Sequence, residues 1–173
     1  KQHDHWDIHV MNADGSGRAR LTETPLRVIV EQRINGQEPR PWNNVAPVWS
    51  PDGSSVAYVS FESGLSAIFI HNIHTGVREK IASFKGMNSA PAWSPDGKTI
   101  AYTRAVQRNP LEGENGPAWT ELHVLDTAGR SRPFVTGKVN VSGVQWTPGG
   151  SGIAFLAKRE GDAHKTLYVI PLG

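Results

Sequence analysis

The sequence contains no cysteine. Disulfide frameworks and thiolate metal sites are therefore excluded, whereas an oxidising and a reducing compartment both stay open. No apolar run approaches the roughly 20 residues of a membrane-spanning helix, so we expect no membrane insertion. The Gly-x-Ser-x-Gly motif that presents the nucleophile of many serine hydrolases is also missing. We therefore expect no enzyme activity and no cofactor.

Charge of neither sign dominates the chain. Eighteen basic and 16 acidic residues give a formal net charge of +2 and are scattered along the sequence. A nucleic-acid-binding domain concentrates its basic residues on one face or in one run, and no such cluster is present. We expect no nucleic-acid partner. The length of 173 residues favours a single domain.

Glycine and proline are plentiful, at 18 and 12 residues, and many of them belong to a repeated motif. The motif reads Ala-Pro-Val-Trp-Ser-Pro-Asp-Gly at 46–53, returns with one change at 90–97, and survives in weaker form at 143–150. A period of about 40–45 residues is typical of β-propeller blades. The repeated tryptophans are expected to pack between neighbouring blades; they are Trp49, Trp93 and Trp146.

Each motif predicts a strand, a tight turn and a second strand. Ser-Pro-Asp-Gly has the residues that a type I turn prefers at its four positions. The flanking residues alternate between apolar and polar and are rich in β-branched and aromatic types, which favours strands. In the third copy Gly149 replaces the aspartate, so we expect a looser turn there.

These elements predict an all-β fold, a β-propeller of four-stranded antiparallel blades forming one module over residues 1–173. We expect an outer half-blade at 1–22, a full blade at 45–82, a full blade with a long loop at 88–136, and a partial blade at 140–173. That makes about three and a quarter blades, whereas closed propellers typically have about 4–8. We expect the ring to be completed by a homo-oligomer, with a dimer favoured, or by further chain.

The motif resembles the repeat of TolB-type β-propellers, bacterial relatives of WD-repeat proteins. The residues that carry the resemblance are Pro-x-Trp-Ser-Pro-Asp-Gly-x-x-Ile-Ala-Tyr and Ile-x-Val-Met-Asn-Ala-Asp-Gly. The resemblance implies a non-catalytic module that binds a protein or peptide partner, in the family's case a lipoprotein of the periplasmic Tol-Pal envelope system. Localisation is otherwise open.

Two alternatives stand beside this interpretation. Residues 101–172 resemble the propeller domain of prolyl-oligopeptidase-family serine peptidases, which implies a substrate gate above a hydrolase domain outside this chain. Different parts of the chain resemble different relatives, and the first residue is Lys1 rather than Met. This mosaic is also what a fragment, or an engineered self-assembling propeller with no natural ligand, would show.

Irregular connections hold the candidate partner-binding residues. Aromatic and acidic side chains in such loops can anchor a peptide, although packing over blade edges and simple solvation are the plainer roles. The candidates are Trp42, Arg108, Glu112, Glu114 and Trp119.

A second group of polar residues recurs at every other position near the N-terminus. On a strand, His3, His5, Asp7 and His9 would share one face and could reach a zinc ion. A polar terminal strand facing water is the plainer reading, and we expect no metal site.

Overall fold

The computed structural model describes residues 5–23, 35, 42–83, 88–106 and 119–172. Every regular element in these ranges is a β-strand. The described residues contain no helix long and apolar enough to cross a membrane. The first six strands are β1 His9–Val10, β2 Ala19–Arg20, β3 Asn44–Trp49, β4 Ser55–Ser60, β5 Ala67–Asn72 and β6 Arg78–Ser83. The other seven are β7 Asn88–Trp93, β8 Thr99–Val106, β9 Trp119–Asp126, β10 Ser131–Val135, β11 Val139–Trp146, β12 Gly152–Arg159 and β13 Thr166–Pro171.

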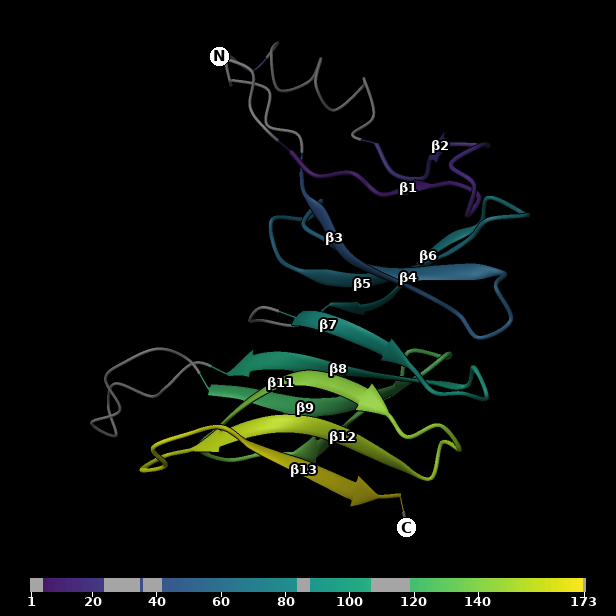
Figure 1. The fold of residues 1–173 in the computed structure, drawn as a ribbon. Helices are drawn as coiled ribbons and strands as arrows, with labels where there is room; N and C mark the ends of the chain where they lie inside the picture. Colours follow the sequence, from purple (N-terminus) through teal and green to yellow (C-terminus); the bar gives the residue numbers. More distant parts are fainter. Residues whose placement is uncertain (1–4, 24–34, 36–41, 84–87, 107–118, 173) are drawn as a thin grey trace.

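The strands form antiparallel meanders stacked one above the next. We call β3–β6 blade one, β7–β10 blade two, β11–β13 blade three, and β1–β2 the N-terminal hairpin. Figure 1 shows them in chain order from the N-terminal to the C-terminal end of the stack. A single parallel bridge between Asn140 and Thr120 joins blade two to blade three. The predicted fold class is confirmed, and the described sheets form a partial propeller that does not close on itself.

The three motif turns have a common backbone. Gly53, Gly97 and Gly150 all take a left-handed conformation, with φ between 70° and 72°. Such a φ favours glycine because a side chain would clash with the backbone. In the third turn the Thr147 hydroxyl accepts a hydrogen bond from the amide of Gly152 at 3.0 Å, as the Ser50 hydroxyl does from Ser55 in the first. The third turn therefore keeps its hydroxyl contact although it has no aspartate.

The first strand of each blade carries a bulge, which follows two paired residues in β3 and β7 and four in β11. In β3 the register with β4 shifts between Val45 and Val48, and in β11 it shifts between Ser142 and Gln145. In β3 and β11 the first residue of the bulge, Ala46 or Gly143, has a positive φ, at 53° and 62°. A bulge increases the local twist of a strand. A bulge that adds twist is therefore present in the inner strand of every blade, although its position and backbone differ.

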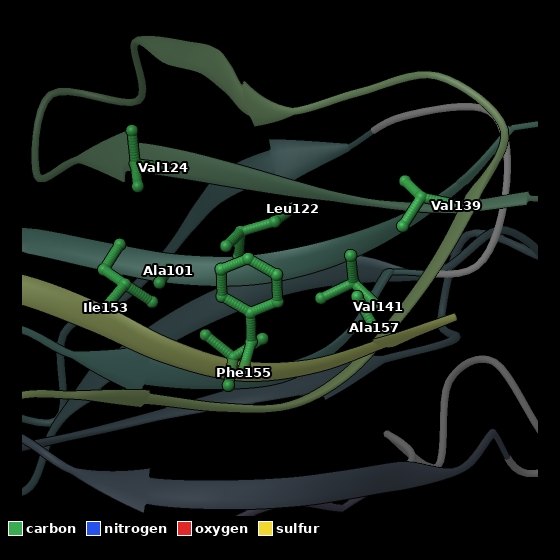
Figure 2. Packing of buried hydrophobic residues seen from close by; sticks show 9 residues of the cluster. Ala101, Leu122, Val124, Val139, Val141, Ile153, Phe155 and Ala157 are labelled. Atoms are coloured by element: carbon green, nitrogen blue, oxygen red, sulfur yellow. The ribbon is translucent and has the colours of Figure 1, made fainter. Parts of the chain in front are cut away.

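The core is divided into three clusters, each between neighbouring sheets. Side chains alternate along each middle strand, so one set faces the preceding sheet and the other faces the following one. Between the N-terminal hairpin and blade one lie Ile8, Val56, Tyr58, Ala67 and Phe69. Between blades one and two lie Val59, Ile68, Ala82, Tyr102 and Leu125. Between blades two and three lie Ala101, Leu122, Val124, Val139, Val141, Val144, Ile153, Phe155 and Ala157, as Figure 2 shows.

The repeated tryptophans do not all pack between blades. Trp146 does so, and its indole nitrogen donates a hydrogen bond to the carbonyl of Ala92 in blade two at 2.9 Å. Trp49 departs from the expectation, because it is 47% exposed. The N-terminal hairpin contributes only two strands, and neither of them supplies the inner strand that would cover this indole.

Candidate functional site

A groove of about 590 Å³ lies between blades one and two, where their motif turns come side by side. Blade one contributes its first turn together with side chains of β5 and β6. Blade two contributes its own turn and the loop that follows β9. The lining residues are Ser50, Pro51, Asp52, Ser54, Ser55, Ile70, Glu79, Trp93, Pro95, Asp96, Gly97 and Thr127. The groove therefore combines carboxylates with an apolar part made by proline, isoleucine and tryptophan.

Among the described residues that line the groove, three are carboxylates and none is a lysine or arginine. The Ser50 hydroxyl donates to Asp52 at 2.6 Å and the Ser54 amide donates at 3.0 Å, and these hydrogen bonds lower the pKa of Asp52 to about 2. The Ser94 hydroxyl, at 2.6 Å, lowers the pKa of Asp96 in the same way. Hydrogen bonds to the charged form stabilise it. Both groups are therefore ionised at neutral pH and give the groove negative charge, and Lys98 places a positive charge next to Asp96.

The Asp52→Asn variant is expected to show what ionisation of the first turn contributes to stability. The folded-state pKa of Asp52 is about 2, below its ordinary value of 3.8. The contribution is therefore present above the ordinary pKa and is lost as the pH falls toward the folded-state value. We expect the difference in unfolding free energy between wild type and variant to narrow as the pH falls. Urea unfolding at a series of acidic pH values measures it, and a constant difference would contradict the assignment.

The indole of Trp93 is a further feature of the groove. Its nitrogen is buried and has no hydrogen-bond partner among the described residues, whereas that of Trp146 reaches the carbonyl of Ala92. Trp93 lines the groove beside the two aspartates. A buried donor without a partner is costly in a folded protein. The groove thus offers acceptors and an apolar surface, whereas the indole nitrogen of Trp93 is buried behind its wall.

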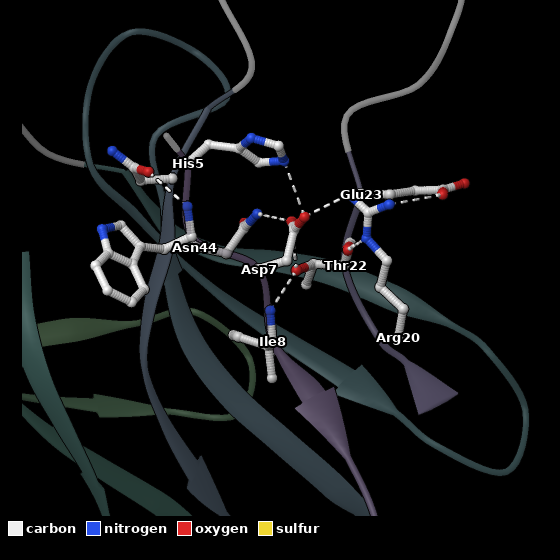
Figure 3. A network of polar contacts seen from close by, with 9 residues as sticks. His5, Asp7, Ile8, Arg20, Thr22, Glu23 and Asn44 are labelled. Atoms are coloured by element: carbon white, nitrogen blue, oxygen red, sulfur yellow. Dashed lines mark hydrogen bonds and ion pairs between the residues drawn. The ribbon is translucent and has the colours of Figure 1, made fainter. Parts of the chain in front are cut away.

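A second polar cluster holds the N-terminal hairpin against blade one. The carboxylate of Asp7, with only 8% of its side chain exposed, accepts hydrogen bonds from Thr22 at 3.2 Å and from Asn44 at 3.3 Å. Arg20 pairs with the same carboxylate, and His5 lies 3.1 Å from it. Figure 3 shows these partners converging from the hairpin and from the start of β3. Through these partners the Asp7 carboxylate links the N-terminal hairpin to blade one. We call these residues the Asp7 cluster.

Two of the four residues that the sequence predicts on one polar face, His5 and Asp7, belong to this cluster. His5 is engaged by Asp7, whereas His9 is exposed and His3 lies outside the described residues. Within the described ranges, no group of three or more histidine, aspartate and glutamate side chains is placed to hold a metal ion.

The predicted partner-binding residues are distributed as follows. Trp42 is half-buried, and Trp119 begins β9 with only 8% of its surface exposed. Arg108, Glu112 and Glu114 lie outside the described residues. No motif predicts the groove, because Glu79 and Thr127 lie outside the repeated motif and reach the groove only through the stacking of blades. Recurrence of aspartate in the first two turns was the one available signal.

Comparison with known proteins identifies the family of this chain. A family model described as the TolB beta propeller domain matches residues 41–173. This chain belongs to the TolB beta propeller domain family. A relative, the Tol-Pal system protein TolB of Hahella chejuensis, is 42% identical over 82 residues. That alignment covers 47% of this chain and 15% of the relative.

Solved structures of TolB proteins share the fold of this chain. TolB from Acinetobacter baumannii superposes with a TM-score of 0.68 at 24% identity, over 96% of this chain and 35% of that one. Prolyl oligopeptidase B from Galerina marginata superposes with a TM-score of 0.55 at 17% identity, over 76% of this chain and 21% of that one. At these identities the likeness is one of fold. The chain spans well under half of each of these proteins.

Proposed function

We propose that this chain is a non-catalytic, protein-binding module of the TolB type that acts in the periplasm. The family match and the 42% identity to a Tol-Pal system protein support this role. The prolyl oligopeptidase resemblance rests on fold similarity at 17% identity, so a substrate gate is the less supported alternative. The groove between blades one and two is the observation that carries the proposal.

The chemistry of the groove favours a lysine-containing extended segment of a partner protein. Asp52, Glu79 and Asp96 would attract its ammonium groups, and the ring of Trp93 would contact its aliphatic carbons. Tryptophan at the wall of a groove is a frequent anchor in protein interfaces. Electrostatic attraction of this kind also speeds association and weakens as salt is added.

A short capped peptide of alternating lysine and alanine tests the proposal, with calorimetry on the whole 173-residue chain. The double variant Asp52→Asn with Asp96→Asn should bind about tenfold more weakly, since exposed ion pairs contribute up to about 1 kcal/mol each. Trp93→Leu removes the aromatic part of the groove wall, and it should weaken binding as well.

The control removes two carboxylates elsewhere, through Glu160→Gln with Asp162→Asn. Both residues are exposed near the connection between β12 and β13, far from the groove in sequence and outside its lining. This control should bind the peptide nearly as well as wild type. Equal loss in both double variants would mean that net charge, rather than the groove, attracts the peptide, and that would overturn the assignment.

We also propose that the module is a homo-oligomer, with a dimer favoured. The described sheets leave the propeller open at both ends of the stack. An exposed sheet face at each end is a surface that another blade can cover.

A further inference from the structure

The two ends of the stack carry exposed apolar side chains. At the C-terminal end, Leu156, Leu167 and Val169 are 39%, 65% and 59% exposed. At the N-terminal end, Trp6 and Met11 are 70% and 65% exposed. These five are the majority of the strongly exposed large hydrophobic side chains in the described ranges. Such concentration at the ends indicates surfaces that are meant to be covered.

Positions equivalent to the C-terminal patch are buried in the other blades. Leu156 on β12 pairs directly with Leu167 on β13. In blade one the same strands pair Val59 with Ile68, and both of these side chains are fully buried. Blade two covers them. Blade three therefore carries the same apolar pair with no following sheet in the described residues.

The residue that covers the blade-one pair has a counterpart in the N-terminal hairpin. Leu125, at the end of β9, packs in one cluster with Val59 and Ile68 and is fully buried. It directly precedes Asp126, whose amide bonds across the turn to the carbonyl of Arg130.

In the hairpin, Asn12 takes the place of Asp126, because its amide bonds across the turn to the carbonyl of Ser16. Met11, which directly precedes Asn12, is therefore the counterpart of Leu125. Ile8 and Val10 face blade one, and the alternation of the strand directs Met11 to the opposite, uncovered side. The two ends of the stack thus carry the two halves of a contact that the interior already makes.

We infer that the Leu156–Leu167 face of one copy docks against the Met11 side of the N-terminal hairpin of a second copy, head to tail. This inference rests on the proposed homo-oligomer and names its interface. The contact repeats the one that Leu125 makes with Val59 and Ile68. A contact between two different surfaces leaves one of each free, and a two-fold arrangement uses both pairs to close a ring.

Sedimentation and native mass measurements on the 173-residue chain test the interface. Wild type should be a dimer, and Leu167→Glu should be a monomer because it places a charge in an apolar contact. Leu65→Glu is the matched control. Leu65 is 50% exposed but lies at neither end of the stack, so this variant should stay dimeric. A monomeric wild type, or a dimeric Leu167→Glu variant, would overturn the inference.

Mixing two monomeric variants distinguishes a head-to-tail contact from any other. Met11→Glu should also be monomeric, yet its Leu167 face is intact, and the Leu167→Glu copy keeps an intact Met11. An equimolar mixture should therefore regain dimers through one sound contact, and a mixture that stays monomeric would rule the arrangement out. Peptide binding lies between blades one and two, so it should persist in both variants. If the wild-type protein did not bind the peptide, that result would count against the proposed function and not against the dimer interface.

Discussion

Replacing Phe155 by Ala is expected to lower the free energy of unfolding by about 3–5 kcal/mol. Phe155 is 2% exposed and belongs to the cluster between blades two and three. Figure 2 shows its ring among the other side chains of this cluster. The ring also stacks on Tyr168, with centroids 5.7 Å apart and an interplanar angle of 17°. Truncation would leave a cavity between two sheets and remove this ring contact. Urea unfolding followed by circular dichroism measures the change.

Leu65→Ala serves as the control for the loss of a large side chain. Leu65 is 50% exposed, so its truncation should change the free energy of unfolding by roughly 0.5 kcal/mol or less. A Phe155→Ala variant within about 1 kcal/mol of wild type would show that blades two and three are not held together by this cluster.

The Gly152→Ala variant is expected to destabilise the protein by about 1–3 kcal/mol through overpacking. A Cβ atom at Gly152 would stand 2.8 Å from the carbonyl oxygen of Ile170 on the neighbouring strand β13. Real Cβ atoms essentially never approach a backbone atom so closely, so the strand pair must separate. Thermal and urea unfolding should both report the loss.

Gly149→Ala is the matched control in the same hairpin. No atom lies within 4 Å of a Cβ built there. This variant should be neutral, or more stable by up to about 1 kcal/mol, because alanine restricts the unfolded chain more than glycine does. If both variants lost the same stability, the cause would be the backbone of the turn rather than the contact with Ile170.

Local signals were sufficient to predict the fold class. The residues of the turn motif predict the hydrogen bonds that the turn makes. The alternation of apolar and polar residues on both sides of Ser50 and Ser94 predicts which side chains face inward. Because the motif recurs, each copy supports the interpretation of the others. The stacking of antiparallel sheets then follows from the need to cover two apolar faces per blade.

The candidate site could not be predicted, because it depends on contacts between blades. Glu79 and Trp93 meet at the groove only after two sheets have been stacked. The exposure of Trp49 had the same origin, since the sequence repeats the residue but not the strand that would cover it. The Asp7 cluster joins residues up to 37 positions apart, and the pattern that contains His5 and Asp7 does not indicate Thr22 or Asn44 as their partners.

The division of the core into separate clusters has a consequence for how such a protein changes over evolutionary time. Each cluster joins only two adjacent sheets, so the molecule behaves as a series of nearest-neighbour layers. Gene duplication can insert a layer, and deletion can remove one, while every remaining boundary keeps its own packing. Blade number can therefore drift within such a lineage without redesign of the sheets that stay.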